Sequence, residues 1–400
     1  MGPLDGLRIL DMTTVLMGPY ATQILGDYGA DVIKVEAPSG DLIRQIGPKR
    51  HEGMGPLFMN TNRSKRSVAL DLKHPSGRES LMRLVEKADV LITNIRPKAM
   101  ARLGLSWDAL EPQNPRLIYA ALVGFDQRGP YAARPAYDDL IQGGACIAHS
   151  FIRAGQQPSY VPAAIADRIV GMSAVNAILS AVIERTRSGH GQRVEVPMFE
   201  TMLSMILGDH LGGLTYEPPM DEGGYSRHLS PDRRPYQTKD GYVCALIYND
   251  GHWERFYREL GQPEMPAADP RFASFNARMA HIDEVYAELG RIMVTRTTRE
   301  WLDLFDRADV PAMPMHSFKS VLEDPHLAAT GFFQDVDHPT EGPMRQMAVP
   351  TTFSRTGAKP ERLAPQLGAD GPAVLAEAGL DPKEIAALVD AGVLTLPKEA

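Results

Sequence analysis

The chain has 400 residues, of which 44% are hydrophobic and 23% are charged, and its formal net charge is −8. This length favours two domains over a single core, and the composition is ordinary for a globular protein in water. The negative charge argues against a nucleic acid or an anionic membrane as the main partner. Two cysteines cannot form a disulfide framework, and they fit a reducing cytoplasm.

Export, membrane and metal signals are absent from the sequence pattern. The first residues have neither the basic nor the apolar run of an export signal, so a cytoplasmic location is expected. No uncharged apolar stretch of about 20 residues predicts a membrane span. Neither Cys146 nor Cys244 has a CxxC partner or a nearby group of histidines, so no metal site is predicted.

The N-terminal part alternates between predicted strands and helices. Short apolar strands are expected at 7–12, 30–36, 66–72, 88–94 and 117–124, and helices are expected to begin near Pro19 and Pro75. This alternation predicts an α/β layer with a mostly parallel sheet. The ligand crevice should lie beyond the carboxyl ends of the strands, where residues 15–17, 94–96 and 124–125 fall.

The opening strand–helix–strand unit raises the possibility of a dinucleotide site, with Glu36 as the ribose acid. The turn after the first strand lacks the G-x-G-x-x-G pattern, and Gly18 is its only glycine. Dinucleotide binding is therefore disfavoured. Basic residues along this half are either solvated surface charges or contacts for the phosphates of a nucleotide-bearing ligand; they are Arg63, Lys65, Arg66, Lys73, Arg96, Lys98 and Arg102.

Asp167 stands where a long apolar helix should begin. Apolar residues recur at helical spacing from Ile169 to Ile183, and a basic turn and Gly189 then end the pattern. This predicts a helix buried over much of its circumference. At or next to the N-cap, free N–H groups and the helix dipole would favour ionised Asp167. Two interpretations stay open: Asp167 only caps the helix, or its carboxylate is a covalent nucleophile.

The second half begins with a strand near 193–198 and a helix near 199–211, followed by a linker rich in Gly and Pro. A hairpin is predicted with its turn at 239–241, followed by helices at 251–261, 281–294 and 298–308, the last with a capping box of Thr297 and Glu300. The predicted organisation is a large domain at 1–205, a linker at 206–235, a small domain at 236–317, a return linker at 318–352 and a C-terminal segment at 353–400 that packs on the large domain.

Two further groups of residues are candidates for a site. Tyr137 and Asp138 follow a proline turn, where they either cap a helix or contact a substrate. Arg227, Arg233 and Arg234 cluster in the linker, where they form either a solvent or interface patch or a receptor for a substrate carboxylate. The sequence contains no nucleophile elbow, Walker loop or His-Glu-x-x-His pattern.

Several motifs together resemble the class III CoA-transferases, the CaiB/BaiF family that includes formyl-CoA and carnitine CoA-transferases and the α-methylacyl-CoA racemases. The resemblance extends over essentially the whole chain, including a Lys-Asp-Gly turn at 239–241 and a tail motif at 363–368. The motifs are Val-Leu-Met-Gly-Pro at 15–19, Gly-Ala-Asp-Val-Ile-Lys-Val-Glu at 29–36, Asn-Arg-Ser-Lys-Arg-Ser at 62–67, Leu-Asp-Leu-Lys at 70–73, Asn-Ile-Arg-Pro at 94–97 and Ser-Gly-His-Gly-Gln at 188–192.

This resemblance implies a fold, an assembly and a site. The fold would be a Rossmann-like large domain plus a smaller α+β domain, in a ring-shaped chain that interlocks with a second copy as a homodimer. Asp167 would be the nucleophile, acyl-CoA would be a substrate, and no permanent cofactor would be held. The implied CoA contacts are Val15, Leu16, Met17, Leu70, Lys73, Asn94, Ile95, Arg96, Ala99, Arg102, Tyr137 and Met198.

Some positions depart from the family's pattern. Val123 and Pro135 stand where formyl-CoA transferase has lysines that contact CoA, and Gly223 and Gly224 only faintly resemble its glycine loop. An oxalate or formyl substrate is therefore disfavoured. The tail motif also differs, with Ala369-Asp370 where many relatives carry Glu-His.

Racemases of the family place a His-Asp pair where this chain has Tyr137 and Asp138, so a base for α-proton transfer is missing. The resemblance therefore favours transfer of CoA from an acyl-CoA to a carboxylic or dicarboxylic acid through aspartyl anhydride and aspartyl-CoA intermediates. A racemase and a non-catalytic CoA-binding protein are the alternatives. Candidate substrate contacts are Tyr137, Asp138, Arg227, Arg233 and Arg234.

Overall fold

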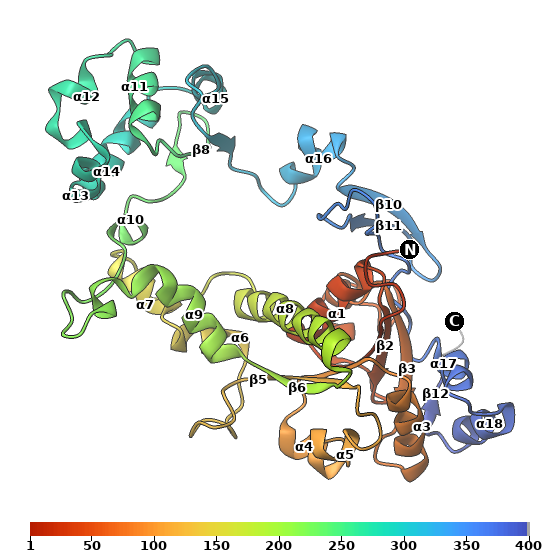
Figure 1. The fold of residues 1–400 in the computed structure, drawn as a ribbon. Coiled ribbons are helices and arrows are strands. Elements are labelled where there is room, and N and C mark those ends of the chain that lie inside the picture. Colours follow the sequence, from red (N-terminus) through yellow and green to blue (C-terminus); the bar gives the residue numbers. More distant parts are fainter. Residues whose placement is uncertain (398–400) are drawn as a thin grey trace. The chain divides into compact units, whose positions relative to one another are not determined.

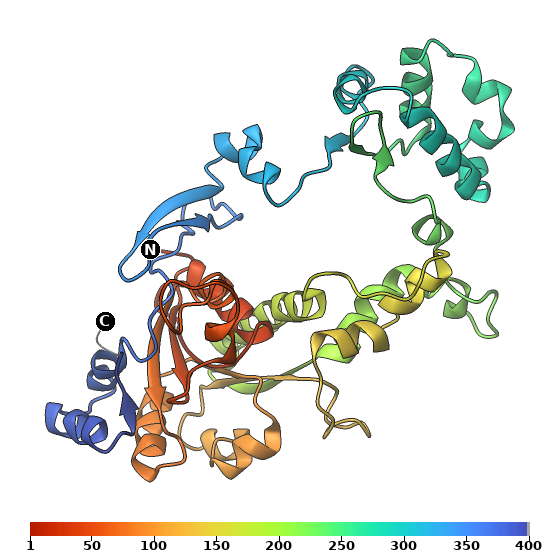
Figure 2. The ribbon, with the colours of Figure 1, turned by 180° about the vertical axis from the view of Figure 1, so that it is seen from behind.

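The computed structural model describes residues 1–397, which divide into two compact units. Unit 1 comprises Met1–Ala145, Val161–Ser204 and the described part of Pro325–Ala400, and unit 2 comprises Cys146–Tyr160 and Met205–Asp324. Figures 1 and 2 show the two units from opposite sides. Each unit has its own sheet and its own apolar core.

Unit 1 contains the following elements in chain order: β1 (Arg8–Met12), α1 (Met17–Asp27), β2 (Asp31–Glu36), η1 (Leu42–Gln45), α2 (Pro56–Met59), β3 (Lys65–Leu70), α3 (Pro75–Glu86), β4 (Val90–Thr93), α4 (Pro97–Arg102), α5 (Trp107–Leu110), β5 (Ile118–Val123), α6 (Asp138–Gly144), α8 (Ile165–Ser188), β6 (Gln192–Pro197), α16 (Pro325–Ala329), β10 (Phe333–His338), β11 (Gly342–Met347), α17 (Gly371–Glu377), α18 (Pro382–Asp390) and β12 (Leu394–Thr395).

The seven strands of the large sheet in unit 1 run in the order β12-β3-β2-β1-β4-β5-β6. All neighbours pair in parallel except β12, which is antiparallel to β3. The order from β3 to β6 is that of a Rossmann sheet, which reverses direction between β1 and β4. The predicted α/β fold with a mostly parallel sheet is confirmed.

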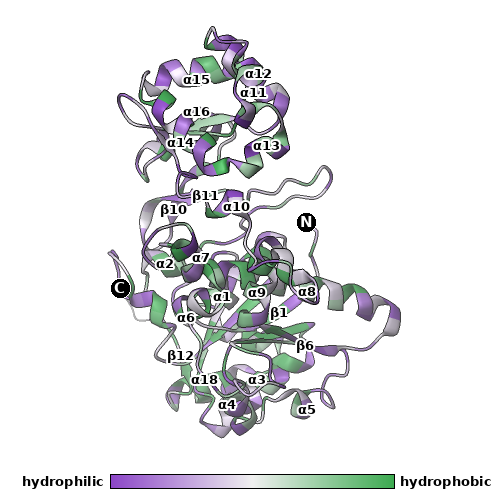
Figure 3. Cartoon of the chain, turned by 90° about the vertical axis from the view of Figure 1, so that its left-hand side faces the viewer, coloured by the Kyte–Doolittle hydropathy of each residue, from purple (hydrophilic) through white to green (hydrophobic). Residues whose placement is uncertain are grey.

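Helices cover both faces of this sheet, so β3, β4 and β5 are buried at every residue. Residues of β4 and β5 are mostly apolar, whereas β3 also buries Lys65, Arg66 and Ser67; hydrophobic stretches of the sheet are green in Figure 3. On one face, α3, α5 and the C-terminal helices α17 and α18 pack on the strands in a single core cluster. Helices α1 and α8 lie side by side and contact β1, β2, β5 and β6. Gly171 of α8 permits their close approach, because a Cβ there would lie 2.7 Å from the Met17 carbonyl oxygen.

Helix α8 is less buried in this chain than its sequence pattern predicts. Its buried side includes Val170, Val175 and Ile178, whereas Met172 is 45% exposed and Ile183 is 62% exposed. The prediction of burial over much of the circumference is therefore wrong for the single chain. By length and composition alone this helix is apolar enough to cross a membrane, but the core helix of a protein without a membrane span passes the same test. Its packing on α1 and the ion pair of Arg185 with Asp89 are features of a core helix.

Unit 2 is built from helices around a three-stranded antiparallel sheet in the order β7-β8-β9. The predicted hairpin is confirmed, with Gln237 opposite Tyr242, and so is the capping box of Thr297 and Glu300. The elements are α7 (Ile147–Arg153), η2 (Gly212–Thr215), α10 (Ser226–Leu229), β7 (Tyr236–Gln237), β8 (Tyr242–Ala245), α11 (Asp250–Glu259), α12 (Met265–Ala268), η3 (Pro270–Phe272), α13 (Phe275–Ala280), α14 (Ile282–Met293), α15 (Thr298–Arg307), β9 (Ala312–Pro314) and η4 (Ser320–Glu323). Helix α9 (Met198–His210) has residues in both units.

The unit boundaries differ from the predicted domains at several places, and the predicted linker at 206–235 belongs to unit 2. Residues Cys146–Tyr160, predicted within the large domain, belong to unit 2. The predicted return linker at 318–352 is folded, because it contains α16 and the β10–β11 hairpin, and most of it belongs to unit 1. The C-terminal segment lies on the large sheet, where β12 pairs with β3.

Candidate active site

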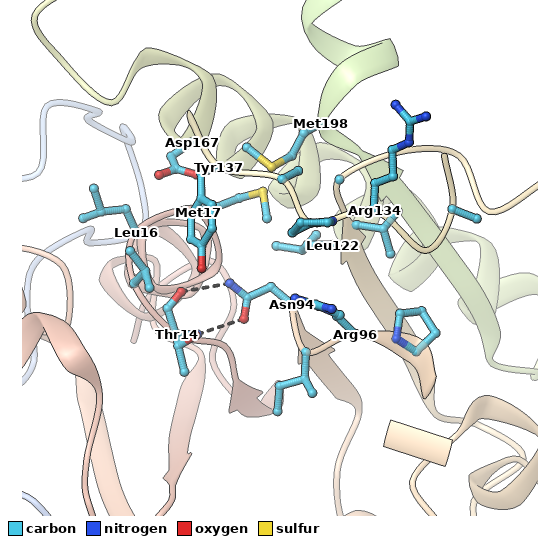
Figure 4. A pocket seen from close by; sticks show the side chains of 18 of the residues that line it. Thr14, Leu16, Met17, Asn94, Arg96, Leu122, Arg134, Tyr137, Asp167 and Met198 are labelled. Atoms are coloured by element: carbon cyan, nitrogen blue, oxygen red, sulfur yellow. Dashed lines mark hydrogen bonds between the residues drawn. The ribbon is translucent and has the colours of Figure 1, made fainter. Parts of the chain in front are cut away.

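A cavity of about 220 Å³ lies where the strand order of the large sheet reverses (Figure 4). Its wall is formed by the segments that follow β1, β4 and β5, as expected for a ligand site in a doubly wound sheet. We call it the switch-point cavity. Its lining residues are Thr14, Val15, Leu16, Met17, Asn94, Ile95, Arg96, Pro97, Leu122, Val123, Gly124, Gln127, Ala132, Arg134, Pro135, Ala136, Tyr137, Asp167 and Met198.

Most of the residues predicted to contact CoA meet at this cavity. Val15, Leu16 and Met17 come from the loop after β1 and the start of α1, and Asn94, Ile95 and Arg96 follow β4. Tyr137 and Met198 complete the predicted set within it. The amide of Asn94 donates to the Thr14 carbonyl oxygen at 2.8 Å and accepts from the Thr14 N–H at 2.9 Å, which ties the two loops together (Figure 4).

Asp167 lines the cavity from the third residue of α8. The N-cap of this helix is Ala164, and no side chain caps it, so the interpretation of Asp167 as a cap is wrong. Its backbone N–H donates instead to the Asp138 carboxylate at 2.9 Å. Gln142 also donates to Asp138, and its own carbonyl oxygen accepts from the N–H of Val161. These hydrogen bonds connect the start of α6 with the start of α8, next to Asp167.

The Asp167 carboxyl is harder to ionise than the sequence predicts. Burial, and next the charge of Asp138, raise its pKa from 3.8 to about 6. The expectation that the helix start would favour the ionised form is therefore corrected. Arg168 compensates only weakly, because its guanidinium lies 4.3 Å from the ring centroid of Tyr20 and forms no ion pair with a carboxylate among the described residues.

A second cavity, of about 240 Å³, adjoins the first, since both are lined by Thr14 and Ile95. Leu70 and Lys73 line this second cavity together with Glu36, Asp41 and Asp71. Two of the residues predicted to contact CoA, Ala99 and Arg102, line neither cavity.

Sequence reasoning missed Arg134, which lines the switch-point cavity beside Pro135. Its guanidinium lies 4.0 Å from the ring centroid of Tyr131, and no ion pair involves it within residues 1–397. Arg96, also in the lining, likewise has no carboxylate partner within that range. The cavity therefore has two cations available to an anionic ligand. The sequence did contain a signal for Arg134: it is a basic residue next to Pro135, the position where a relative was expected to have a lysine that contacts CoA.

The three predicted arginines of unit 2 lie together in a cavity of about 360 Å³. Arg227 donates to the Tyr286 hydroxyl at 2.9 Å, whereas Arg234 pairs with the carboxylate of Asp232 at 2.7 Å. Arg233 also lines this arginine cavity. The arrangement leaves N–H groups of Arg227 available to an anion, because its partner is an uncharged hydroxyl.

The raised pKa of Asp167 predicts a pH-dependent stability difference. Since the folded-state pKa of about 6 lies above the ordinary value of 3.8, the fold loses stability as the pH rises from about 4 to about 6, and the loss is constant above that range. Asp167→Asn removes this cost, so we expect the variant to gain about 1–2 kcal/mol relative to wild type between about pH 4 and pH 8, less than the roughly 3 kcal/mol of a fully shielded group. Denaturant unfolding at both pH values measures it, with exposed Asp139→Asn as control. An equal difference at both pH values would contradict the shift.

Comparison with known proteins identifies the family. Residues 4–371 match CoA-transferase family III. A succinate–glutarate CoA-transferase of Agrobacterium fabrum is 34% identical over 94% of this chain and 95% of its own length. A formyl-CoA:oxalate CoA-transferase of Escherichia coli is 31% identical over 96% and 98%. The crystal structure of a CaiB/BaiF family protein from Brucella suis superposes with a TM-score of 0.78 at 34% identity, over 94% of this chain and 99% of that one. This chain therefore belongs to the class III CoA-transferases.

Proposed function

We propose that this protein transfers CoA from an acyl-CoA to a free carboxylate, with Asp167 as the nucleophile. The observation that carries the proposal is the position of Asp167, which is the single carboxylate among the described lining residues of the switch-point cavity. A partly buried carboxylate is poorly hydrated and therefore more nucleophilic than one in water. Family membership and relatives named as CoA-transferases support the same reaction class.

We infer that acyl-CoA lies across the two joined cavities. The thioester would lie near Asp167, and the nucleotide end would lie in the cavity of Leu70 and Lys73. The cations Arg96, Arg134 and Lys73 supply charge for the phosphates of CoA. Ala99 and Arg102 remain predicted contacts outside both linings.

The proposed reaction has two symmetrical halves. The Asp167 carboxylate attacks the donor thioester carbonyl, a C–O bond forms, the C–S bond breaks, and a mixed anhydride and CoA thiolate result. The thiolate then attacks the Asp167 carbonyl, which releases the donor acid and leaves an aspartyl-CoA thioester. The acceptor carboxylate attacks that thioester, which releases CoA thiolate and forms a second mixed anhydride. The thiolate then attacks the acceptor carbonyl of this anhydride, which forms the acceptor acyl-CoA and frees the Asp167 carboxylate.

No proton is gained or lost in these steps, so the reaction needs no general acid or base. The switch-point cavity fits this demand, because its described lining contains no histidine. An α-proton transfer would need two bases, and Tyr137 stands where the related racemases were expected to have their histidine. This favours the transferase over the racemase.

Oxygen labelling tests the nucleophile directly. In the proposed scheme Asp167 loses one oxygen to the donor acid and regains one from the acceptor in each cycle. An ¹⁸O-labelled acceptor should therefore label Asp167, and in the next turnover the released donor acid. Mass spectrometry of the peptide that contains Asp167 measures the first event, and hydroxylamine added during turnover should trap the same residue as a hydroxamate.

We expect Asp167→Ala and Asp167→Asn to lose transferase activity, whereas exposed Asp139→Asn retains it. Retained transfer in both Asp167 variants would refute the mechanism. Deuterium entry at the α-carbon without any acceptor would support a racemase instead. Binding of acyl-CoA by wild type with no turnover of any donor–acceptor pair would support a CoA-binding protein.

The arginine cavity suggests a dicarboxylic acceptor. We propose that Arg227, with Arg233 and Arg234, binds a substrate carboxylate in the arginine cavity. Tyr137, which lines the switch-point cavity, and Asp138, which accepts from the Asp167 N–H, are proposed as further substrate contacts in unit 1. Arg227 and Arg233 are stronger candidates than Arg234, because neither forms an ion pair with a carboxylate among the described residues, and a hydrogen bond to Tyr286 fixes the position of Arg227. Guanidinium groups suit this task, since they bind carboxylates through two parallel hydrogen bonds.

A substrate panel tests this assignment. Arg227→Ala should raise the KM for dicarboxylic acceptors by about 10-fold or more, which corresponds to one charge-assisted hydrogen bond, and leave monocarboxylic acceptors unchanged. Arg255→Ala, which changes an arginine that already pairs with Asp309, is the matched control. An equal loss for both acceptor classes would contradict the assignment.

We also propose that the chain functions as a homodimer, the interlocked assembly that its family resemblance implies. The exposed apolar side chains Met172 and Ile183 on α8 support a partner on that face, because such residues rarely stay in water on a core helix. Analytical ultracentrifugation should give twice the mass of the chain, and Ile183→Glu should shift the equilibrium towards monomer. A wild-type protein that sediments as a monomer at micromolar concentration would contradict this proposal.

A further inference from the structure

The loop between β1 and α1 is held through its backbone by three side chains from other parts of unit 1. Lys34 of β2 donates from Nζ to the Thr13 carbonyl oxygen at 2.9 Å. Asn94 binds both backbone groups of Thr14. The carboxylate of Asp41 accepts from the Val15 N–H, with its two oxygens at 3.1 and 3.2 Å. The backbone conformation of residues 13–15 is therefore held by side chains from outside the loop.

Val15 is the strained residue of this loop. Its φ is +68°, in the left-handed region, where a β-branched side chain is a genuine outlier. Such a conformation persists only when surrounding contacts hold it. The hydrogen bond from Val15 to Asp41 is the contact that fixes the peptide on the N-terminal side of the strained residue.

Asp41 is itself rigidly placed. Its side chain is completely buried and lies 3.2 Å from the equally buried Nζ of Lys34. The backbone N–H of Asp41 donates to the Glu36 carboxylate at 2.9 Å, and Glu36 pairs with Arg44 at 2.7 Å. A buried carboxylate with this many partners is a defined anchor, since any movement would leave a charge unpaired.

We propose that Asp41, oriented by Lys34, is a positioning residue for acyl-CoA: it holds Val15 in the left-handed conformation and so keeps the start of α1 in the shape that the CoA thioester requires. This inference rests on the proposed function. Val15 and Thr14 line the switch-point cavity, whereas Asp41 lies behind them and lines the adjoining one. Release of Val15 to a negative φ would turn the backbone ahead of Leu16 and Met17, which line the same cavity.

The test compares the effect of Asp41→Ala in the wild-type protein and in the Val15→Gly background. Asp41→Ala should raise the dissociation constant of CoA and the KM for acyl-CoA by about 10-fold, while the KM for the carboxylate acceptor stays unchanged. Hydrogen exchange should become faster at the Val15 amide. In the Val15→Gly background, Asp41→Ala should raise the dissociation constant of CoA by less than about 3-fold, because glycine adopts a positive φ without support.

Asp27→Asn is the matched control, because Asp27 forms an equally buried pair with Arg63 at the far end of α1 and does not touch the loop. It should lower stability without changing the affinity for CoA. If Asp41→Ala does not fold, Asp41→Asn decides the question, since its amide keeps an acceptor for Val15 but turns an N–H towards Lys34. For Asp41→Asn we expect a smaller rise in the dissociation constant of CoA, of about 3-fold.

Equal CoA affinity in wild type and both Asp41 variants, or equal losses with and without Val15→Gly, would overturn the positioning role alone. Equal losses in Asp41→Ala and Asp27→Asn would overturn it as well, because the effect would then be one of general stability. Failure of the wild-type protein to bind CoA would overturn the proposed function and this inference together.

Discussion

The ion pair of Asp11 and Lys65 is the constraint on which the architecture of unit 1 depends. The two charged groups are 3.0 Å apart with no exposure to solvent. Asp11 also accepts from Thr22 of α1, and Lys65 donates to the Pro19 carbonyl oxygen, so the pair joins β1, β3 and the first turn of α1. Burial lowers the pKa of Lys65 to about 8, against the opposing effect of Asp11. Loss of either partner would leave an uncompensated buried charge.

The surroundings of Asp167 have the opposite effect on the ionisation of its carboxyl group. The Asp11 carboxylate accepts hydrogen bonds from two hydroxyl groups and a lysine, whereas the Asp167 carboxylate accepts none from a side chain among the described residues and has a second carboxylate beside it. The same residue type therefore has a lowered pKa at one site and a raised pKa at the other. The first arrangement fixes a fold, and the second suits the nucleophilic role proposed for Asp167, at a cost in stability.

Local patterns in the sequence predicted much of this structure, and long-range contacts account for what they missed. The strand–helix alternation, the hairpin and the capping box depend on neighbours in the chain, and all are present. The crevice followed from the rule that parallel strands end at one edge. Asp138 meets Asp167 across 29 residues, so neither the shifted pKa nor the absence of a capping bond had a local signal. The exposed side of α8 was mispredicted because apolar spacing does not tell which surface covers it.

If acyl-CoA binds across the two adjoining cavities as proposed, its length offers a physical advantage to a nucleophile such as the one proposed at Asp167. A carboxylate with a raised pKa must be ionised before it attacks, and closing the site around it increases that cost. Contacts with the non-reacting nucleotide end, in the cavity of Lys73, can offset this cost without stabilising the thioester itself. Thr14 and Ile95 belong to both linings, so the clamped loop is shared by the binding end and the reacting end. In the proposed reaction, rigid support of that loop is therefore what would allow remote binding energy to act at Asp167.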